Sequence, residues 1–224
     1  MTYRERRVPG AGLACVWSRE YSGTGESRIV PDACVDVIWH RESGRLWVAG
    51  PDTGPQVHVS EPGMLVGLRF RPGDTALGVP ADALRDARVA LADLWPRAAE
   101  LGERLASASD VVAAQEVLVA ALPAAPDPVV AVIRGLAAEG GSVRGIADAL
   151  GMSERQLRRR ARAAFGYGPK MLHRVLRFQR ALGLARAGVA FGDVAYAAGY
   201  ADQAHLAREV RGLAGVPLGD VVRG

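Results

Sequence analysis

Residues 143–165 carry the pattern that most restricts how this chain can fold. Three apolar residues recur there at the spacing of one helix face: Ile146, Ala147 and Leu150. Gly151 follows them, and a glycine suits a left-handed helix end because it has no Cβ. Ser153, with Gln156 three residues later, forms the capping-box pattern that begins another helix. The segment therefore predicts two short helices joined by a tight turn.

The second of these helices combines an apolar face with a cationic one. Leu157 and Ala161 fall on its inner side. Its arginines are Arg155, Arg158, Arg159, Arg160 and Arg162. A helix held at a sharp angle to its neighbour, with a cationic outer face, fits the major groove of DNA. The pattern is typical of a helix-turn-helix.

A second unit of the same kind lies in residues 191–211. Gly199 would form its turn and Asp202 would cap its second helix, 49 residues after Ser153. An apolar-periodic segment over 169–187 predicts a long helix between the two units. Such a bridge can present two reading helices to one face of a duplex, where major-groove segments recur about every 34 Å.

The charge is distributed unevenly along the 224 residues. Residues 129–224 carry 15 Lys and Arg against 7 Asp and Glu, a net of +8. Residues 1–128 carry 13 against 17, a net of −4, and the chain as a whole has +4. This asymmetry indicates that the C-terminal half meets a polyanion and the N-terminal half does not.

The N-terminal half has β-like runs first and helical patterns after them. We expect strands at 13–18, 33–40, 45–49, 56–60 and 64–70, and helices at 96–106 and 110–122. Ser43 and Gly44 lie between two of the runs and predict a hairpin turn. Three prolines within 122–128 then break the pattern, and a helix is expected over 128–138.

The C-terminal half resembles the DNA-binding domain of the AraC/XylS family of transcriptional regulators. The resemblance runs through both units, IADALGMSERQLRRRARAAFGYGP and VAYAAGYADQAHLAREVRGLAGVP, and is most specific over residues 199–206. It implies seven helices with two helix-turn-helix motifs joined by a long helix. The fold class expected is therefore α+β, with a β-rich domain at 1–122, a linker at 123–128 and an all-α DNA-binding domain at 129–224.

The resemblance also implies a role for individual polar side chains. Residues expected to read base edges are Arg155, Arg158, Arg159, Gln203, His205 and Arg208. Residues expected to contact phosphates are Arg162, Arg174, Arg177 and Arg211. Arginine pairs bidentately with guanine, whereas phosphate contacts fix register without reading sequence. Because Ala161, Leu206 and Val210 stand where the family usually has aromatic core residues, we expect the second unit to be the weaker reader.

The N-terminal half resembles a small regulatory domain found ahead of such DNA-binding domains in actinobacterial regulators, often with half of a cupin-like barrel. Candidate ligand-binding residues are Trp39, Asp36, Arg69 and Phe70, and Trp17 and Trp47 could line the same pocket. These side chains could instead be part of the domain core. The helices over 96–122 could form a dimer interface. Duplex DNA, RNA polymerase, a small-molecule effector and a second copy are the partners this interpretation suggests, and both activation and repression of transcription are compatible with it.

Other chemistry receives little support from the sequence. Cys15 and Cys34 are too few for a disulfide framework and are expected to be buried free thiols. His40 and His58 lack metal-ligand spacing, so no metal, cofactor or enzymatic activity is expected. The chain lacks an apolar run long enough for a signal peptide or a membrane helix, which favours the cytoplasm. The alternative function is a ligand-binding or enzymatic N-terminal domain whose basic appendage binds DNA only nonspecifically.

Overall fold

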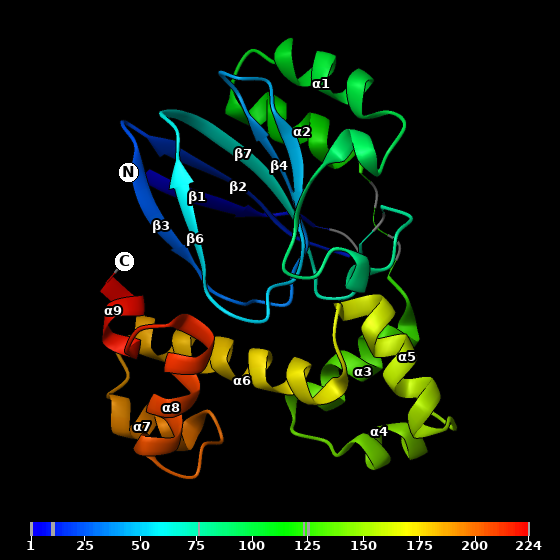
Figure 1. Ribbon diagram of the computed structural model, residues 1–224, viewed down its shortest axis with the longest axis vertical. Helices are drawn as coiled ribbons and strands as arrows, with labels where there is room; N and C mark the ends of the chain where they lie inside the picture. Colours follow the sequence, from blue (N-terminus) through cyan, green and yellow to red (C-terminus); the bar gives the residue numbers. More distant parts are fainter. Residues whose placement is uncertain (1, 10–11, 76, 123, 125, 224) are drawn as a thin grey trace.

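A computed structural model gives the arrangement of the chain over residues 2–9, 12–75, 77–122, 124 and 126–223. Antiparallel strands and two trailing helices occupy the N-terminal half, and helices alone form the C-terminal half. The expected α+β class is confirmed. Figure 1 shows the helical half lying along one end of the sheet.

The N-terminal half is built on one six-stranded antiparallel sheet and a separate two-stranded ribbon. The large sheet has the strand order β1-β2-β7-β4-β5-β8, and β3 pairs with β6 in the ribbon. The strands are β1 (Thr2–Arg7), β2 (Leu13–Tyr21), β3 (Gly25–Ile29), β4 (Asp36–His40), β5 (Leu46–Ala49), β6 (Gln56–Ser60), β7 (Gly63–Phe70) and β8 (Arg88–Ala90).

Five of these strands were predicted, although one prediction was too long. The strand expected over 33–40 begins only at Asp36, because Ala33 has a φ of +65° and the Asp32 carboxylate accepts a hydrogen bond from the Cys34 amide. The expected hairpin turn is confirmed, with Gly44 at a φ of +69°. Strands β1 and β3, which are mostly exposed and polar, were not predicted, nor was the three-residue β8.

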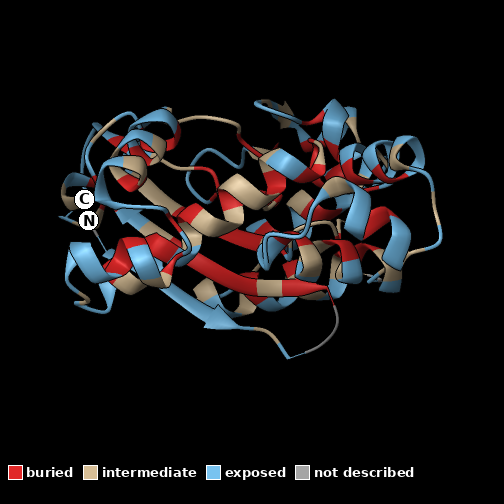
Figure 2. Ribbon diagram, turned by 90° about the horizontal axis from the view of Figure 1, so that it is seen from below, coloured by how far each residue is buried: buried red, intermediate tan, exposed pale blue. Residues whose placement is uncertain are grey.

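Two helices cover one face of the sheet. Residues 98–106 form α1 and residues 111–121 form α2, close to the expected bounds. Leu101, Leu105 and Leu118 from these helices pack against Val37, Trp39, Leu68 and Phe70 from the strands. Figure 2 shows the buried residues gathered in the interior strands and on the inner sides of the helices. This face holds the core of the N-terminal half.

The C-terminal half contains two helix-turn-helix units, each with a third helix. Its helices are α3 (Pro128–Ala138), α4 (Val143–Ala149), α5 (Glu154–Phe165), α6 (Pro169–Arg186), α7 (Phe191–Ala197), α8 (Gln203–Ala214) and α9 (Leu218–Arg223). These are the seven helices that the resemblance implied. The capping box predicted at Ser153 is present, and the Asp202 side chain accepts a hydrogen bond from the His205 amide.

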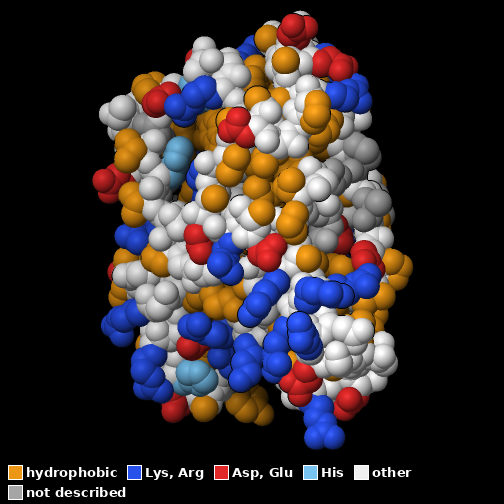
Figure 3. Space-filling view, turned by 45° about the vertical axis from the view of Figure 1, so that its right-hand side comes forward, with side chains coloured by type: hydrophobic (Ala, Val, Ile, Leu, Met, Phe, Trp, Pro, Cys, Tyr) orange, Lys and Arg blue, Asp and Glu red, His pale blue; other side chains and the backbone are white. Residues whose placement is uncertain are grey.

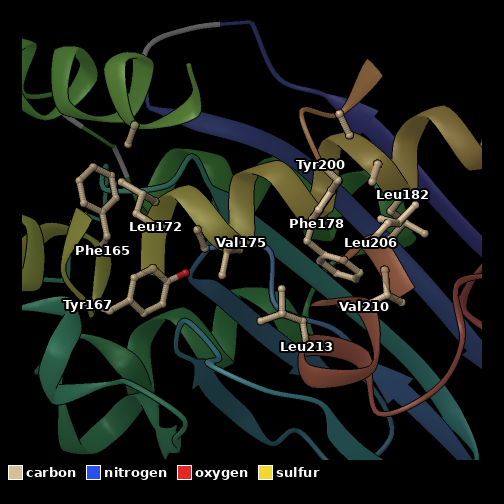
Figure 4. Close-up of a cluster of buried hydrophobic side chains, with 14 of the residues drawn as sticks. Phe165, Tyr167, Leu172, Val175, Phe178, Leu182, Tyr200, Leu206, Val210 and Leu213 are labelled. Atoms are coloured by element: carbon tan, nitrogen blue, oxygen red, sulfur yellow. The ribbon is translucent and has the colours of Figure 1, made fainter. Parts of the chain in front are cut away.

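Helix α6 is the axis of the helical half. Figure 4 shows Phe165 and Leu172 packed at one end of it, and Phe178, Leu182 and Val210 packed at the other. Both units therefore share one continuous core. Ala161, Leu206 and Val210, which stand where the family usually has aromatic core residues, are all buried in that core.

The sheet domain is docked tightly against the first unit. The turn at Gly73 has a φ of +89°, and a Cβ there would lie 2.4 Å from Val130 and 2.6 Å from Phe165. Arg134 on α3 donates a hydrogen bond to the Pro72 carbonyl and pairs with the buried Asp74 at 3.3 Å. Since the space at Gly73 excludes even a methyl group, the first unit and the sheet half are tightly packed together.

The bridging helix and the second unit also contact the sheet half. Gln179 on α6 donates to the Pro31 carbonyl at 2.6 Å. Arg28 on β3 donates to the Ala214 carbonyl at 3.2 Å, next to Gly215, which lies against Pro55. The linker positions 123 and 125 lie outside the described residues.

Candidate nucleic-acid interface and internal cavity

Helix α5 presents a stripe of three exposed arginines. Arg155, Arg159 and Arg162 follow one another at intervals of four and three residues, which places them on one helix face. Opposite them, Leu157, Ala161 and Phe165 are buried in the core. No described carboxylate pairs with the three arginines. Their charges are therefore available to an external anion.

The other two arginines of α5 are paired within the protein. Arg158 contacts Glu154 at 2.5 Å, one helix turn back. Arg160 contacts Asp127 at 2.5 Å, and Asp127 also caps α3 through the amides of Val129 and Val130. Of the base-edge residues expected on α5, Arg155 and Arg159 are unpaired and Arg158 is paired.

Helix α8 carries the corresponding residues of the second unit. Gln203, Arg208 and Arg211 are exposed, while His205 is half-buried. The His205 ring meets Tyr200 edge-on at 5.3 Å and lies 3.4 Å from the Ala201 amide through Nδ1. The histidine is thus held by its own turn, whereas the other three side chains point away from the core.

Arg174 and Arg177 on α6 are engaged by the second unit. Arg174 donates two hydrogen bonds to the Glu209 carboxylate, at 3.0 and 3.3 Å. Arg177 lies 3.6 Å from the same carboxylate, and only 15 % of its side chain is exposed. Its Cζ is also 4.2 Å from the centre of the Tyr200 ring. Arg177 is therefore placed as an internal brace between α6 and α8, which does not fit the phosphate role expected from the sequence.

Glu209 is the acidic partner of Arg174 and Arg177, and its role was not predicted from the sequence. Burial alone would raise the pKa of Glu209, but the hydrogen bond from Arg174 and the charges of Arg174 and Arg177 lower it below its usual value. Glutamate stands among outward-facing residues of α8, and only the packing of α8 against α6 reveals what it binds. The sequence contained one indication of this ion pair, an acidic residue within a basic reading helix.

On the face seen in Figure 3, basic side chains are densest over the helical half. Figure 3 shows Lys and Arg side chains concentrated over the helical end of the molecule, while the opposite end is mixed and largely apolar. None of the described helices has the length and apolar character needed to cross a membrane. Among the described residues, no group of three His, Cys, Asp or Glu side chains could hold a metal ion.

A cavity of about 1140 Å³ lies on the face of the sheet opposite α1 and α2. Its floor is formed by residues that are paired across neighbouring strands. One row across the sheet contains Trp17 on β2, Gly67 on β7, Ile38 on β4 and Trp47 on β5. The Trp17 ring lies over Gly67, where a Cβ would be 2.2 Å from it. Gln179, Leu182 and Arg186 of α6 form part of the cavity wall.

The structure brings together only two of the four expected ligand residues. Asp36 and Arg69 line the cavity, whereas Trp39 and Phe70 are buried on the opposite face against α1 and α2. Residues an odd number of positions apart in a strand point to opposite faces. Trp39 and Phe70 therefore belong to the core, and Trp17 and Trp47 provide the aromatic surface of the cavity instead.

Several charged side chains on the floor of the cavity form ion pairs with one another. Arg69 donates to both oxygens of Asp36, at 2.9 and 2.7 Å, and lies 3.2 Å from Asp32. Burial raises the pKa of Asp36, and the charge of Arg69 opposes that rise. Arg88 pairs similarly with Asp52 at 2.7 Å.

The two thiols lie close to this floor and are free. Cys15 is buried as expected, whereas Cys34 is only half-buried and precedes β4 in a loop, which the sequence did not predict. Burial raises the pKa of Cys15 to about 11. Thiols with raised pKa values are poor nucleophiles.

Known protein families match both halves of the chain. A family described as a helix-turn-helix domain matches residues 146–224, and a domain of unknown function (DUF6597) matches residues 11–90. No curated protein sequence matches the chain.

Solved structures of one protein from Vibrio cholerae share the fold. Apo ToxT K231A has a TM-score of 0.54 at 12 % identity, covering 96 % of this chain and 98 % of that one. ToxT in the P21 form has a TM-score of 0.52 at 10 % identity, covering 95 % and 98 %. A ToxT structure with bound unsaturated fatty acid has a TM-score of 0.50 at 11 % identity, covering 97 % of each chain.

The two capped helices, the bridging helix and the attached sheet define a DNA-binding protein of the double helix-turn-helix class. With the matched helix-turn-helix domain and the shared two-part fold, the chain resembles the AraC/XylS family of transcriptional regulators.

Proposed function

We propose that this regulator recognises a specific duplex sequence mainly through α5. The observation that carries the proposal is the exposed stripe of Arg155, Arg159 and Arg162 beside paired Arg158 and Arg160. Arg155 and Arg159 would read base edges and Arg162 would contact phosphate, with Gln203, Arg208 and Arg211 contributing from α8. Each bidentate arginine–guanine pair contributes about 1–3 kcal/mol of discrimination.

We further propose that the chain divides as expected, into residues 1–122, a linker at 123–128 and residues 129–224. The separate hydrophobic cores of the sheet and of the helical half support this division. The sheet half would sense a small molecule in the cavity. A fatty acid is bound in one of the similar ToxT structures and a naphthalenyl butenoic acid in another, which makes an organic acid a reasonable effector class.

Selection of bound fragments from genomic DNA, followed by a salt titration, tests the DNA-binding proposal. Fragments enriched by the full chain should share a sequence, and a cognate fragment should bind at least about a thousandfold more tightly than random DNA at the same salt concentration. Similar affinities for both would support the alternative function, a ligand-binding or enzymatic N-terminal half with a nonspecific basic appendage.

A further inference from the structure

The cavity beneath α6 contains an arginine that lacks an acidic partner. Arg19 on β2 lies over two aromatic rings, with its Cζ 5.8 Å from the centre of Tyr3 and 5.5 Å from that of Tyr21. Its Nε is buried and makes no hydrogen bond. Within the described part of the chain, no carboxylate lies within ion-pair distance of Arg19.

Most other cations of the cavity already have partners. Arg69 pairs with Asp32 and Asp36, and Arg88 pairs with Asp52. The complete lining contains six arginines against four acidic residues. The lining of the cavity therefore has a surplus of positive charge, and two buried donors from β2 make no hydrogen bond there, Nε of Arg19 and Nε1 of Trp17. A buried arginine donor without a partner favours an anionic ligand.

Next to Arg19, part of the cavity surface is apolar. Leu65 pairs directly with Arg19 across the sheet, and Ile38 lies in the next row between Trp17 and Trp47. Both tryptophans and both aliphatic side chains line the cavity. A ring system laid over Ile38 and Leu65 would meet indole surfaces on two sides, and aromatic contacts of this kind stabilise planar ligands.

From this arrangement we propose that the cavity binds an organic anion with a planar apolar body, its acidic group at Arg19 and its ring between Trp17 and Trp47. The proposal rests on the sensing role proposed above for the sheet half. Arg186 approaches from α6 as a second cation, and it shares one stripe of that helix with Gln179 and Leu182. The ligand would therefore touch the helix that joins the two DNA-reading units.

Two fluorescent probes with related ring systems test the charge requirement. The full chain is titrated with 8-anilinonaphthalene-1-sulfonate and with its uncharged relative N-phenyl-1-naphthylamine. Both should bind saturably at one site. Substitution of Arg19→Gln should weaken binding of the sulfonate about tenfold or more and leave the neutral probe unchanged, which also shows that the cavity is intact. Arg104→Gln, an exposed arginine of α1, should change neither affinity.

The tryptophans provide the second arm of the test. Trp47→Leu should weaken both probes several-fold, whereas Trp95→Leu, which lies outside the cavity, should weaken neither. The proposal is overturned if binding does not saturate, if Arg19→Gln affects both probes equally or neither, or if Trp47→Leu has no effect.

Affinity for cognate and random DNA is measured on the same preparations. Specific DNA binding without discrimination between the probes would overturn the cavity proposal and leave the proposed function standing. Probe discrimination without specific DNA binding would do the reverse.

Discussion

Arg177 on α6 lies over the ring of Tyr200, with its Cζ 4.2 Å from the ring centre, and so joins the bridging helix to the turn that precedes the second reading helix. The same side chain approaches Glu209 on α8 at 3.6 Å and the Gly199 carbonyl at 3.5 Å. These contacts fix how α8 is oriented relative to α6. The position of the second reading helix therefore depends on an arginine whose side chain already makes contacts within the protein.

Replacing Arg177 with alanine should weaken binding to all DNA sequences alike and lower the melting temperature. The lost cation–π contact is of the order of 0.5–2 kcal/mol. Because Arg177 acts through α8, the dependence of log K on log salt should keep its slope. Arg162→Ala is the control, and its slope should fall by about 0.9. An equal fall for Arg177→Ala would assign it to a phosphate after all.

Arg159→Ala should weaken binding chiefly to DNA that carries the preferred base at one operator position. The loss of binding free energy should be about 1–3 kcal/mol on that DNA and much less on DNA with another base at the same position. Binding to a panel of single-base operator variants measures this loss. Arg160→Ala, on the same helix but paired with Asp127, should leave the preference unchanged. A uniform loss across the panel for Arg159→Ala would remove its base-reading role.

Glu209 should make the stability of the protein depend on pH in the acid range. Its pKa is lowered in the folded state, so its stabilising contribution is complete above the usual value of 4.5 and disappears as the pH falls through the lower folded value. The difference in melting temperature between wild type and Glu209→Gln should therefore shrink below pH 4.5. For Glu103→Gln, an exposed residue of α1, little difference is expected at any pH. A Glu209 difference that persists undiminished in acid would contradict the ion pair.

Gly73→Ala should destabilise the docking of the sheet against the first unit by about 1–3 kcal/mol. The new Cβ would collide with Val130 and Phe165, and the φ of +89° adds backbone strain. Gly78→Ala is the matched control, since its φ is +73° but no atom lies within 4 Å of a Cβ there. Chemical unfolding should show a larger loss for Gly73→Ala. Equal losses would mean that backbone strain alone is responsible.

Local patterns were sufficient for most of the helical half. The capping box at Ser153, the turn at Gly151 and the apolar spacing of Leu157 and Ala161 all depend on residues within one or two helix turns. Such short-range interactions are encoded directly in adjacent residues. The two units and the long bridge could therefore be predicted from the sequence.

Strands and faces were predicted less completely. The exposed strands β1 and β3 have no apolar alternation, because neither face is buried in the core. Strand alternation separates Asp36 from Trp39 and Arg69 from Phe70, so the expected ligand set could have been divided from the sequence alone. Which face of the sheet would contain the cavity could not be predicted from the sequence.

The reading helices, their caps and the arginines of α5 could be predicted without a structure, since they follow from neighbouring residues. Which arginines form ion pairs depends on long-range packing. Glu209 meets Arg174 across 35 positions, and Asp127 meets Arg160 across 33. Packing also places α6 along the wall of the cavity over the sheet. Contacts between residues so far apart in the chain arise from packing, and a single sequence contains no local pattern for them.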